Sequence, residues 1–209
     1  MTSDLDPATS AKARSRVFAL LSLVYRQEPT KEFIEQCRQP ELKSVLAECG
    51  IDLTNIGENE EAFAEELAIE YSDLFLVPKK QVHPYESVYS ESGQEMLWGN
   101  ETVDVKRFIE TFGLSLEETD LLPDHVAVEM ELLGRLKEKE SEAWANGDNK
   151  KAREYLSAER RFLEDHLGRW FPQLADAIEG KAQLPFYRQV TNFARDFIQE
   201  ELEEISKTV

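Results

Sequence analysis

The stretch Asn59-Glu-Glu-Ala-Phe-Ala-Glu-Glu-Leu-Ala-Ile-Glu-Tyr-Ser-Asp-Leu-Phe-Leu-Val-Pro78 decides the fold class of this 209-residue chain. Its apolar side chains recur every three or four residues, which places them on one face of a helix. They are Phe63, Leu67, Tyr71, Leu74 and Phe75. The acidic residues lie mostly on the opposite side. We expect this helix to end near Leu76, because Pro78 disfavours helical geometry at Val77.

The residues before this stretch contain start and stop signals for three further helices. We expect one from an N-cap at Thr9 or Ser10 to about Gln27, one from the N-cap Thr30 to Arg38, and one from Pro40 to Gly50. After a long irregular segment, residues 77–99, the signals resume. Asn100 is expected to cap a helix that Gly113 stops, Pro123 to open a long helix, residues 146–149 to form a turn, and residues 155–198 to be helical.

These patterns predict an all-α protein, a single-domain helical bundle of residues 1–209 with about ten helices. Only nine Gly and eight Pro are present, which argues against a turn-rich β architecture. The 77–99 segment is the one long loop and the only place where we expect a subdivision.

Charge excludes two classes of partner. The chain has 42 acidic and 24 basic side chains, a formal net charge of −18, which repels nucleic acid and anionic membrane surfaces. The same field attracts a cationic peptide and accelerates its capture. Charge alone is equally consistent with a well-solvated surface.

The two cysteines and the N-terminal region indicate the cytoplasm. Cys37 and Cys49 have no metal-site spacing, so we interpret both as reduced core thiols. The apolar run at residues 17–25 follows basic residues but lacks a small-residue cleavage site and is too short to span a bilayer. We therefore expect an amphipathic first helix and no membrane insertion.

Asp124, His125 and Glu129 form the first candidate site. An acid after Pro123 suits a helix N-terminus, and Glu129 lies four residues after His125, on the same helix face. His125 and Glu129 are a weak candidate for a metal site, because no third ligand has a spacing that would bring it to the same metal ion. Asp124 and Glu129 can instead accept hydrogen bonds from arginine, although ordinary helix capping is an alternative reading.

The second candidate site is Pro84-Tyr-Glu-Ser87, on the long loop. It combines a rigid proline, an aromatic side chain that offers contact area, and the carboxylate of Glu86. The alternative is a structural loop in which Tyr85 packs on the core and Glu86 caps a short helix. Its position on a long loop, in a chain that also contains Pro-Asp-His, favours binding.

The sequence contains no common catalytic signature. Nucleotide-binding glycine loops, a Gly-x-Ser-x-Gly elbow and a His-Glu-x-x-His motif are all missing. The pair Arg160-Arg161 before Phe162 resembles an export signal, but its position deep in an expected helix excludes that role. We expect no enzyme activity, no cofactor and no metal.

Several motifs together resemble the TorD/DmsD family of cytoplasmic chaperones for molybdoenzymes. They are Tyr71-Ser-Asp-Leu-Phe75, Pro84-Tyr-Glu-Ser87, Pro123-Asp-His-Val-Ala-Val-Glu129 and Phe162-Leu-Glu-Asp-His-Leu-Gly-Arg-Trp-Phe-Pro172. The resemblance implies an all-helical protein, a monomer or a domain-exchanged homodimer, that binds the twin-arginine signal peptide of a molybdopterin-containing oxidoreductase while the cofactor is inserted. It also implies that Asp124, His125 and the 84–87 loop bind that peptide. Leu122 and His83 depart from the usual pattern, which leaves the subgroup open.

The leading hypothesis places the peptide's apolar stretch in a groove near residues 77–99 and the helix after Pro123, with its arginines on rim carboxylates, Glu86, Asp124 and Glu129. A second hypothesis is a helical adaptor that binds the folded body of a reductase subunit, as in nitrate-reductase-type assembly. The third and weakest is an enzyme that uses His125 with Glu129 or Asp124 as acid and base.

Overall fold

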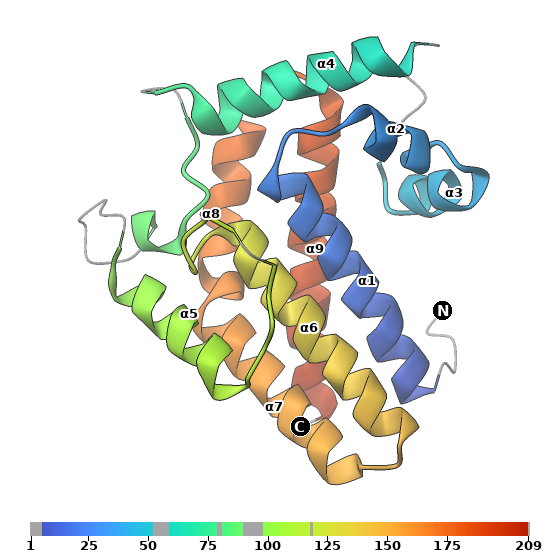
Figure 1. Cartoon of the computed structure of the whole chain (residues 1–209), viewed down its shortest axis with the longest axis vertical. Coiled ribbons are helices and arrows are strands. Elements are labelled where there is room, and N and C mark those ends of the chain that lie inside the picture. Colours follow the sequence, from blue (N-terminus) through green and yellow to red (C-terminus); the bar gives the residue numbers. More distant parts are fainter. Residues whose placement is uncertain (1–5, 52–58, 79–80, 90–97, 118, 209) are drawn as a thin grey trace. The chain divides into compact units, whose positions relative to one another are not determined.

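The computed structural model describes residues 6–51, 59–78, 81–89, 98–117 and 119–208, which are predominantly helical (Figure 1). The helices are α1 (Pro7–Arg26), α2 (Lys31–Cys37), α3 (Pro40–Glu48), α4 (Glu60–Tyr71), the π-helical turn η1 (Ser72–Leu76), the 3-10 turn η2 (Glu86–Val88), α5 (Asn100–Thr111), α6 (Val126–Ala145), α7 (Asn149–Asp165), α8 (Leu167–Glu179) and α9 (Pro185–Thr208). No β-strand occurs in this described part, so the all-α prediction is confirmed.

Several helix ends follow the expected signals. The Thr30 side chain accepts a hydrogen bond from the Phe33 amide and caps α2, and Pro40 is the first residue of α3. The helix of the 59–78 stretch ends at Leu76, after a final π-helical turn. Such turns inside helices are uncommon and frequent at functional sites.

Three predicted helix starts are wrong by one to four residues. Asp6, and neither Thr9 nor Ser10, caps α1 by accepting the Thr9 amide at 3.1 Å. The N-cap of α5 is Gly99, one residue before Asn100. Pro123 does not open α6, which begins at Val126, because Leu122 to Asp124 form the approach to the helix and His125 is its N-cap.

The chain folds into two compact units. Unit 1 contains Met1–Tyr25, Tyr85–Phe171 and Ile198–Val209, and unit 2 contains Arg26–Pro84 and Pro172–Phe197. One boundary between the units, between residues 84 and 85, falls inside the 77–99 segment, where we expected a subdivision. It stays a prediction that both units belong to a single domain. No helix in the described residues is both long and apolar enough to cross a membrane.

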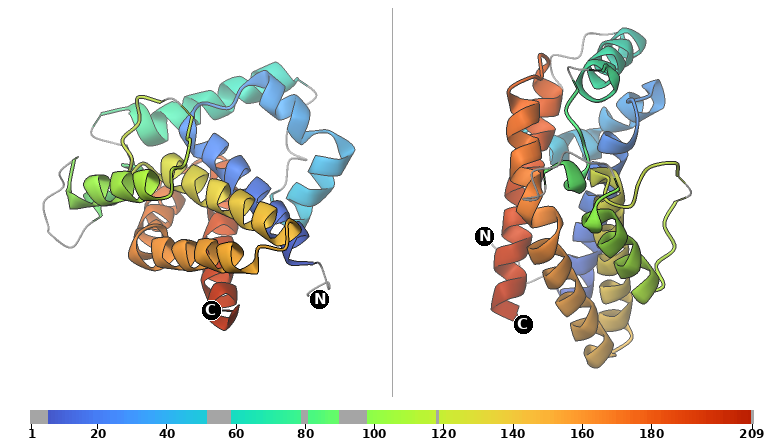
Figure 2. Two further views of the ribbon diagram at one scale, coloured as in Figure 1. Left: turned by 60° about the horizontal axis from the view of Figure 1, so that its bottom comes forward. Right: turned by 90° about the vertical axis from the view of Figure 1, so that its left-hand side faces the viewer.

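Unit 1 is organised around α6. Helices α6 and α7 form an antiparallel pair joined by a short turn, and their ribbons lie side by side in both views of Figure 2. Gly134 of α6 lies against α1, because a Cβ there would meet the Ser15 carbonyl oxygen at 3.3 Å. Leu132, Leu133 and Leu136 of α6 are fully buried, so this helix supplies the centre of the unit's core.

A buried group of charges, the Lys137 network, also lies in unit 1. Lys137 Nζ is 2.7 Å from Glu159, 3.2 Å from Glu201 and 3.4 Å from Glu140, and all four side chains are buried. Arg14 also pairs with Glu201. Burial raises the pKa of Glu159 to about 8 although the Lys137 ammonium opposes the shift.

Unit 2 has an aromatic core. Tyr71 lies 5.0 Å from Phe75, and Phe75 lies 6.3 Å from Tyr187 between ring centroids. The Tyr187 hydroxyl donates to the Leu67 carbonyl oxygen, which ties α9 to α4. Cys37 is a buried free thiol whose pKa burial raises to about 11.

Candidate functional site

The 85–87 loop and the start of α6, both in unit 1, lie side by side. Tyr85 and His125 form an isolated antiparallel β-bridge, and their rings pack edge to face with centroids 4.9 Å apart. The Glu86 amide donates to the Asp124 carbonyl oxygen at 2.9 Å. The two candidate motifs, which are far apart in sequence, therefore form one cluster.

The Asp124 carboxylate holds this cluster together. Asp124 is completely buried, and its two oxygens accept hydrogen bonds from the Ser87 amide at 3.1 Å and the Thr102 hydroxyl at 2.9 Å. One side chain thus links the 85–87 loop, α5 and the start of α6. A buried carboxylate with two donors stabilises its neighbourhood more than a typical neutral hydrogen bond does.

His125 is a capping residue. Its Nδ1 accepts the Ala127 amide at 3.1 Å, so this nitrogen carries no proton. Caps of this kind satisfy one of the free amides at a helix start. The enzyme hypothesis assigned this imidazole ring the role of acid or base, whereas in the structure the ring caps a helix.

Glu86 binds a histidine from the junction of α7 and α8. The Glu86 carboxylate lies 2.8 Å from His166 Nδ1, and the His166 ring stacks on Phe162 with centroids 4.8 Å apart. The junction is tight, because a Cβ on Gly168 would meet the Leu163 carbonyl oxygen at 2.5 Å. The close turn places His166 next to the loop, a contact the sequence analysis did not foresee.

Glu129 is a second fully buried carboxyl in the cluster. Its Oε2 accepts the Trp170 indole N–H at 3.0 Å, and no donor group among the described residues reaches Oε1. Burial, with the neighbouring carboxylates of Glu86 and Asp124, raises the pKa of Glu129 well above its ordinary value. The folded protein therefore favours the protonated form of Glu129 more than the unfolded chain does.

This protonation predicts a pH-dependent stability that Glu129→Gln removes. The folded state keeps a proton that the unfolded chain releases above about pH 4.5, so the free energy of unfolding falls as pH rises through that region. Glutamine stays neutral and still accepts from Trp170. Urea unfolding should therefore show E129Q gaining about 1 kcal/mol or more relative to the native chain between pH 5 and pH 8. Glu142→Gln, on an exposed part of the same helix, should keep the native slope, and an E129Q slope equal to the native one would contradict the assignment.

The burial of these residues corrects one expectation. Glu86, Asp124 and Glu129 are 4%, 0% and 0% exposed, so they do not lie at the rim of a groove. Their oxygens face internal partners because the loop, α5 and α8 close over them. Their contact with the arginines of a peptide stays a prediction that requires this cluster to open.

The other predicted site residues are also largely covered. Pro84 and Ser87 are buried, and Tyr85 is half-buried. Pro84 belongs to unit 2, whereas Tyr85 and the rest belong to unit 1. The expected groove near residues 77–99 falls partly on 79–80 and 90–97, which lie outside the described residues.

The structure adds Trp98, which the sequence analysis treated only as part of a loop. Its side chain is 70% exposed and its backbone φ is +71°, a left-handed conformation that bulky residues rarely adopt. Its neighbour Gly99 packs against Ser87, because a Cβ added to Gly99 would lie 3.2 Å from the Ser87 Cβ. A large exposed aromatic on a strained backbone is a recurrent feature of binding sites. The only signal in the sequence is a lone tryptophan before Gly99 in a long loop.

No group of three or more His, Cys, Asp and Glu side chains among the described residues is arranged to hold a metal ion. The Asp124, His125 and Glu129 side chains instead accept hydrogen bonds from amide, hydroxyl and indole donors. This arrangement fixes a loop against helix ends and leaves no accessible acid–base pair.

Comparison with known proteins identifies the family. The family model described as "Nitrate reductase delta subunit" matches residues 31–176, most of the chain. The chain belongs to this family. The nitrate reductase delta subunit family includes the TorD-type chaperones for redox-enzyme maturation, so the resemblance given by the sequence motifs is confirmed.

Relatives in this family align along nearly the whole chain. A chaperone protein TorD of Photobacterium profundum is 27% identical over 89% of this chain and 91% of its own length. A perchlorate reductase assembly chaperone protein of Dechloromonas aromatica is 26% identical over 92% and 90%. A proposed redox enzyme maturation protein from Archaeoglobus fulgidus has the same fold, with a TM-score of 0.51 at 22% identity over 90% of this chain and 92% of that one. The chain therefore belongs to a family of TorD-type maturation chaperones, and the relatives described above are named as chaperone or assembly proteins.

Proposed function

We propose that this chaperone binds the twin-arginine signal peptide of a molybdopterin-containing oxidoreductase in the cytoplasm and holds the precursor while its cofactor is inserted before export. The observation that carries the proposal is the alignment over about nine tenths of the chain with proteins named as chaperones, one of them for perchlorate reductase assembly. The net charge of −18 supports it, since that field attracts a cationic peptide.

In this proposal the buried Asp124 cluster positions the binding surface. It fixes Tyr85 and the start of α5, next to which Trp98 and Val103 are exposed by 70% and 45%. The apolar stretch of a signal peptide packs on these side chains. Micromolar affinity, about −8 kcal/mol, is sufficient for a client that must later be released.

Trp98→Ala tests this surface. Because truncation of a central interface tryptophan removes much of its contact energy, the Kd of a bound signal peptide should rise about tenfold or more. The melting temperature should change little, since the side chain is mostly exposed. Trp98→Phe, which keeps an aromatic ring, should stay within about threefold of native affinity. Native affinity in a folded W98A protein would remove Trp98 from the site.

One observation favours a second candidate, an adaptor that binds the folded body of a reductase subunit. The matching family model is described as a nitrate reductase subunit. Co-purification with a precursor and with the same precursor lacking its signal segment separates the two functions. The signal-peptide proposal predicts that the complex is lost when the signal segment is deleted, whereas an adaptor retains the complex.

The oligomeric state, a monomer or a domain-exchanged homodimer, stays a prediction.

A further inference from the structure

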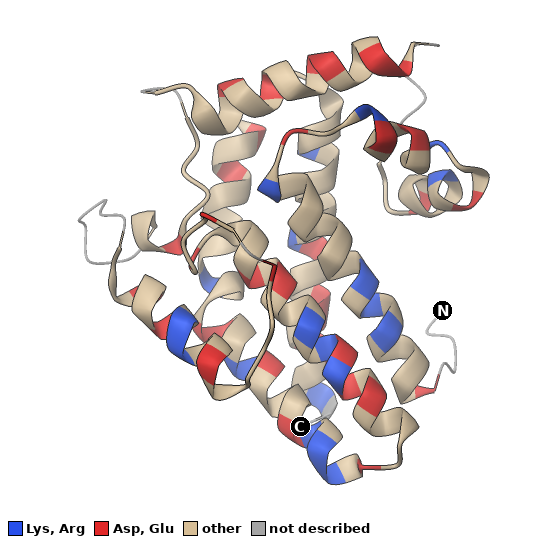
Figure 3. Cartoon of the chain, in the orientation of Figure 1, with Lys and Arg blue, Asp and Glu red and all other residues tan. Residues whose placement is uncertain are grey.

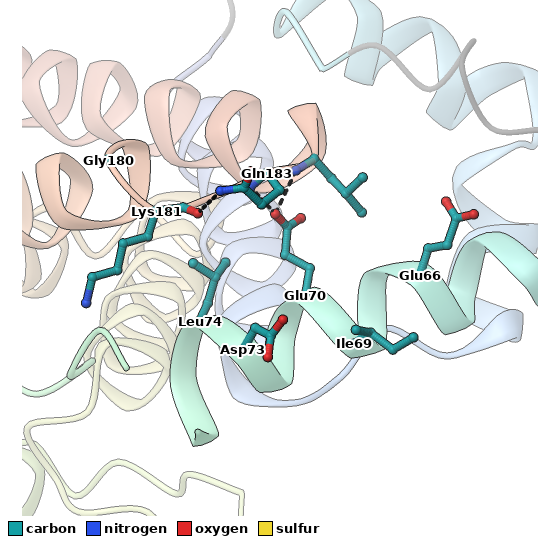
Figure 4. A pocket seen from close by; sticks show the side chains of 9 residues that line it. Glu66, Ile69, Glu70, Asp73, Leu74, Gly180, Lys181 and Gln183 are labelled. Atoms are coloured by element: carbon teal, nitrogen blue, oxygen red, sulfur yellow. Dashed lines mark hydrogen bonds between the residues drawn. The ribbon is translucent and has the colours of Figure 1, made fainter. Parts of the chain in front are cut away.

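A groove of about 740 Å³ lies within unit 2, between the end of α4 with η1 and the turn from α8 to α9 (Figure 4). Ile69, Leu74 and Leu184 supply its apolar walls. Ile69 is 65% exposed, an unusual degree for a large apolar side chain at the end of a packed helix. The groove therefore offers apolar surface open to solvent.

Carboxylates outnumber cations around this groove. Glu66 and Asp73 are exposed and make no ion pair among the described residues, while Glu70 is 6% exposed. Lys181 is the lining cation, and its Nζ donates to the Gln81 carbonyl oxygen at 3.1 Å. Helix α4 carries five acidic and no basic residues, so its charged positions are all red and none is blue in Figure 3.

Glu70 supplies independent evidence of an unfilled polar position. Its Oε1 accepts the amides of Gln183 and Leu184, the latter at 2.7 Å, and so fixes the turn before α9. Its Oε2 is buried and has no hydrogen-bond partner among the described residues. A buried carboxylate oxygen without a donor is costly, and a cationic ligand supplies one.

We infer that this groove is a docking site for a peptide segment in which arginines stand next to apolar side chains. The apolar side chains pack on Ile69 and Leu184, and the guanidinium groups bind Glu66 and Asp73. This inference rests on the proposed function: the segment that docks in the groove is the arginine-containing part of the client's signal peptide. It also gives that part accessible carboxylates, which the buried cluster of unit 1 does not provide.

The test is an amide-resolved NMR titration of the full chain with acetyl-Arg-Arg-Ala-Phe-Leu-amide and its glutamine counterpart. The amides of residues 69–74 and 183–184 should shift saturably with the arginine peptide, and the glutamine peptide should bind at least about threefold more weakly. No shift of these amides up to millimolar arginine peptide would overturn the inference.

Two double variants separate the groove from net charge. Glu66→Gln with Asp73→Asn should weaken binding about three- to tenfold, because two partly exposed ion pairs are lost. Glu61→Gln with Glu65→Gln removes the same charge from exposed positions of the same helix and should stay within about twofold. Equal weakening by both pairs would overturn the groove as the binding site.

The same variants distinguish this inference from the proposed function. A full-length signal peptide that binds the native chain with the groove amides unchanged, and is unaffected by E66Q/D73N, would refute the groove and leave the function standing. Groove shifts with the short peptide, but no binding of any full-length signal peptide, would support the groove's chemistry and refute the proposed function.

Discussion

Asp124→Ala is expected to destabilise the protein by about 2–4 kcal/mol, because it leaves two buried donors without an acceptor. These donors are the Ser87 amide and the Thr102 hydroxyl. The 85–87 loop should then detach from α5. Urea unfolding measures the loss, and hydrogen exchange should rise at the Ser87 amide.

Asp120→Ala is the control, since Asp120 is exposed in the same connection before α6 and should cost less than about 0.5 kcal/mol. Asp124→Asn retains one acceptor and should lie between the two. This expectation gives the Asp124 carboxylate a stabilising role, whereas the sequence-based hypothesis placed it at the rim of a groove as an acceptor for arginine. A stability of D124A equal to that of D120A would show that the Asp124 carboxylate does not hold the loop.

Lys137→Met is expected to cost about 3–5 kcal/mol at neutral pH, because it leaves buried carboxylates without their cation. Glu159 and Glu201 lie 2.7 and 3.2 Å from the lysine ammonium, and both are fully buried. Burial lowers the pKa of Lys137, but the surrounding carboxylates outweigh it and the net shift is upward. The ammonium therefore stays charged in the native protein.

The cost of Lys137→Met should increase with pH. The pKa of Glu159, already raised to about 8, must rise further once the ammonium is gone. The native chain already keeps this proton up to about pH 8, so the stability of the variant should continue to fall above about pH 8, where the contribution of Glu159 to the native slope levels off. Urea unfolding at pH 7 and at pH 9 checks this. Lys139→Met, on an exposed site of α6, should cost less than about 1 kcal/mol at either pH, and a pH-independent K137M effect would contradict the Lys137 network.

Helices whose apolar residues recur at regular spacing were predictable from the sequence. The 59–78 stretch predicts α4 and η1 through Leu76 because its spacing and Pro78 both act locally. The Thr30 cap of α2 was equally predictable, since a cap bonds an amide only three residues away. The start of α6 was not, because His125 replaces the expected proline as the boundary residue.

The cluster was predictable only in part. The sequence hypothesis assigned Asp124, His125 and the 84–87 loop to one site, and the bridge shows that Tyr85 and His125 are neighbours, while peptide binding there stays a prediction. Their burial was not predictable, because it depends on Thr102, His166 and Trp170, which come from three other parts of the chain. Trp98 was missed for a similar reason: its exposure and its φ of +71° result from the surrounding fold and leave no trace in a residue pattern.

The proposed function requires this protein to recognise a twin-arginine signal peptide. The most direct test is calorimetric titration of the purified protein with a panel of such peptides from molybdoenzyme precursors, each beside a version with its arginine pair changed to glutamine. We expect at least one peptide to bind with micromolar Kd and its glutamine version to bind at least about tenfold more weakly. Equal affinity for the arginine and glutamine versions, or no binding by the peptide of a precursor that co-purifies with the protein, would contradict the proposed function.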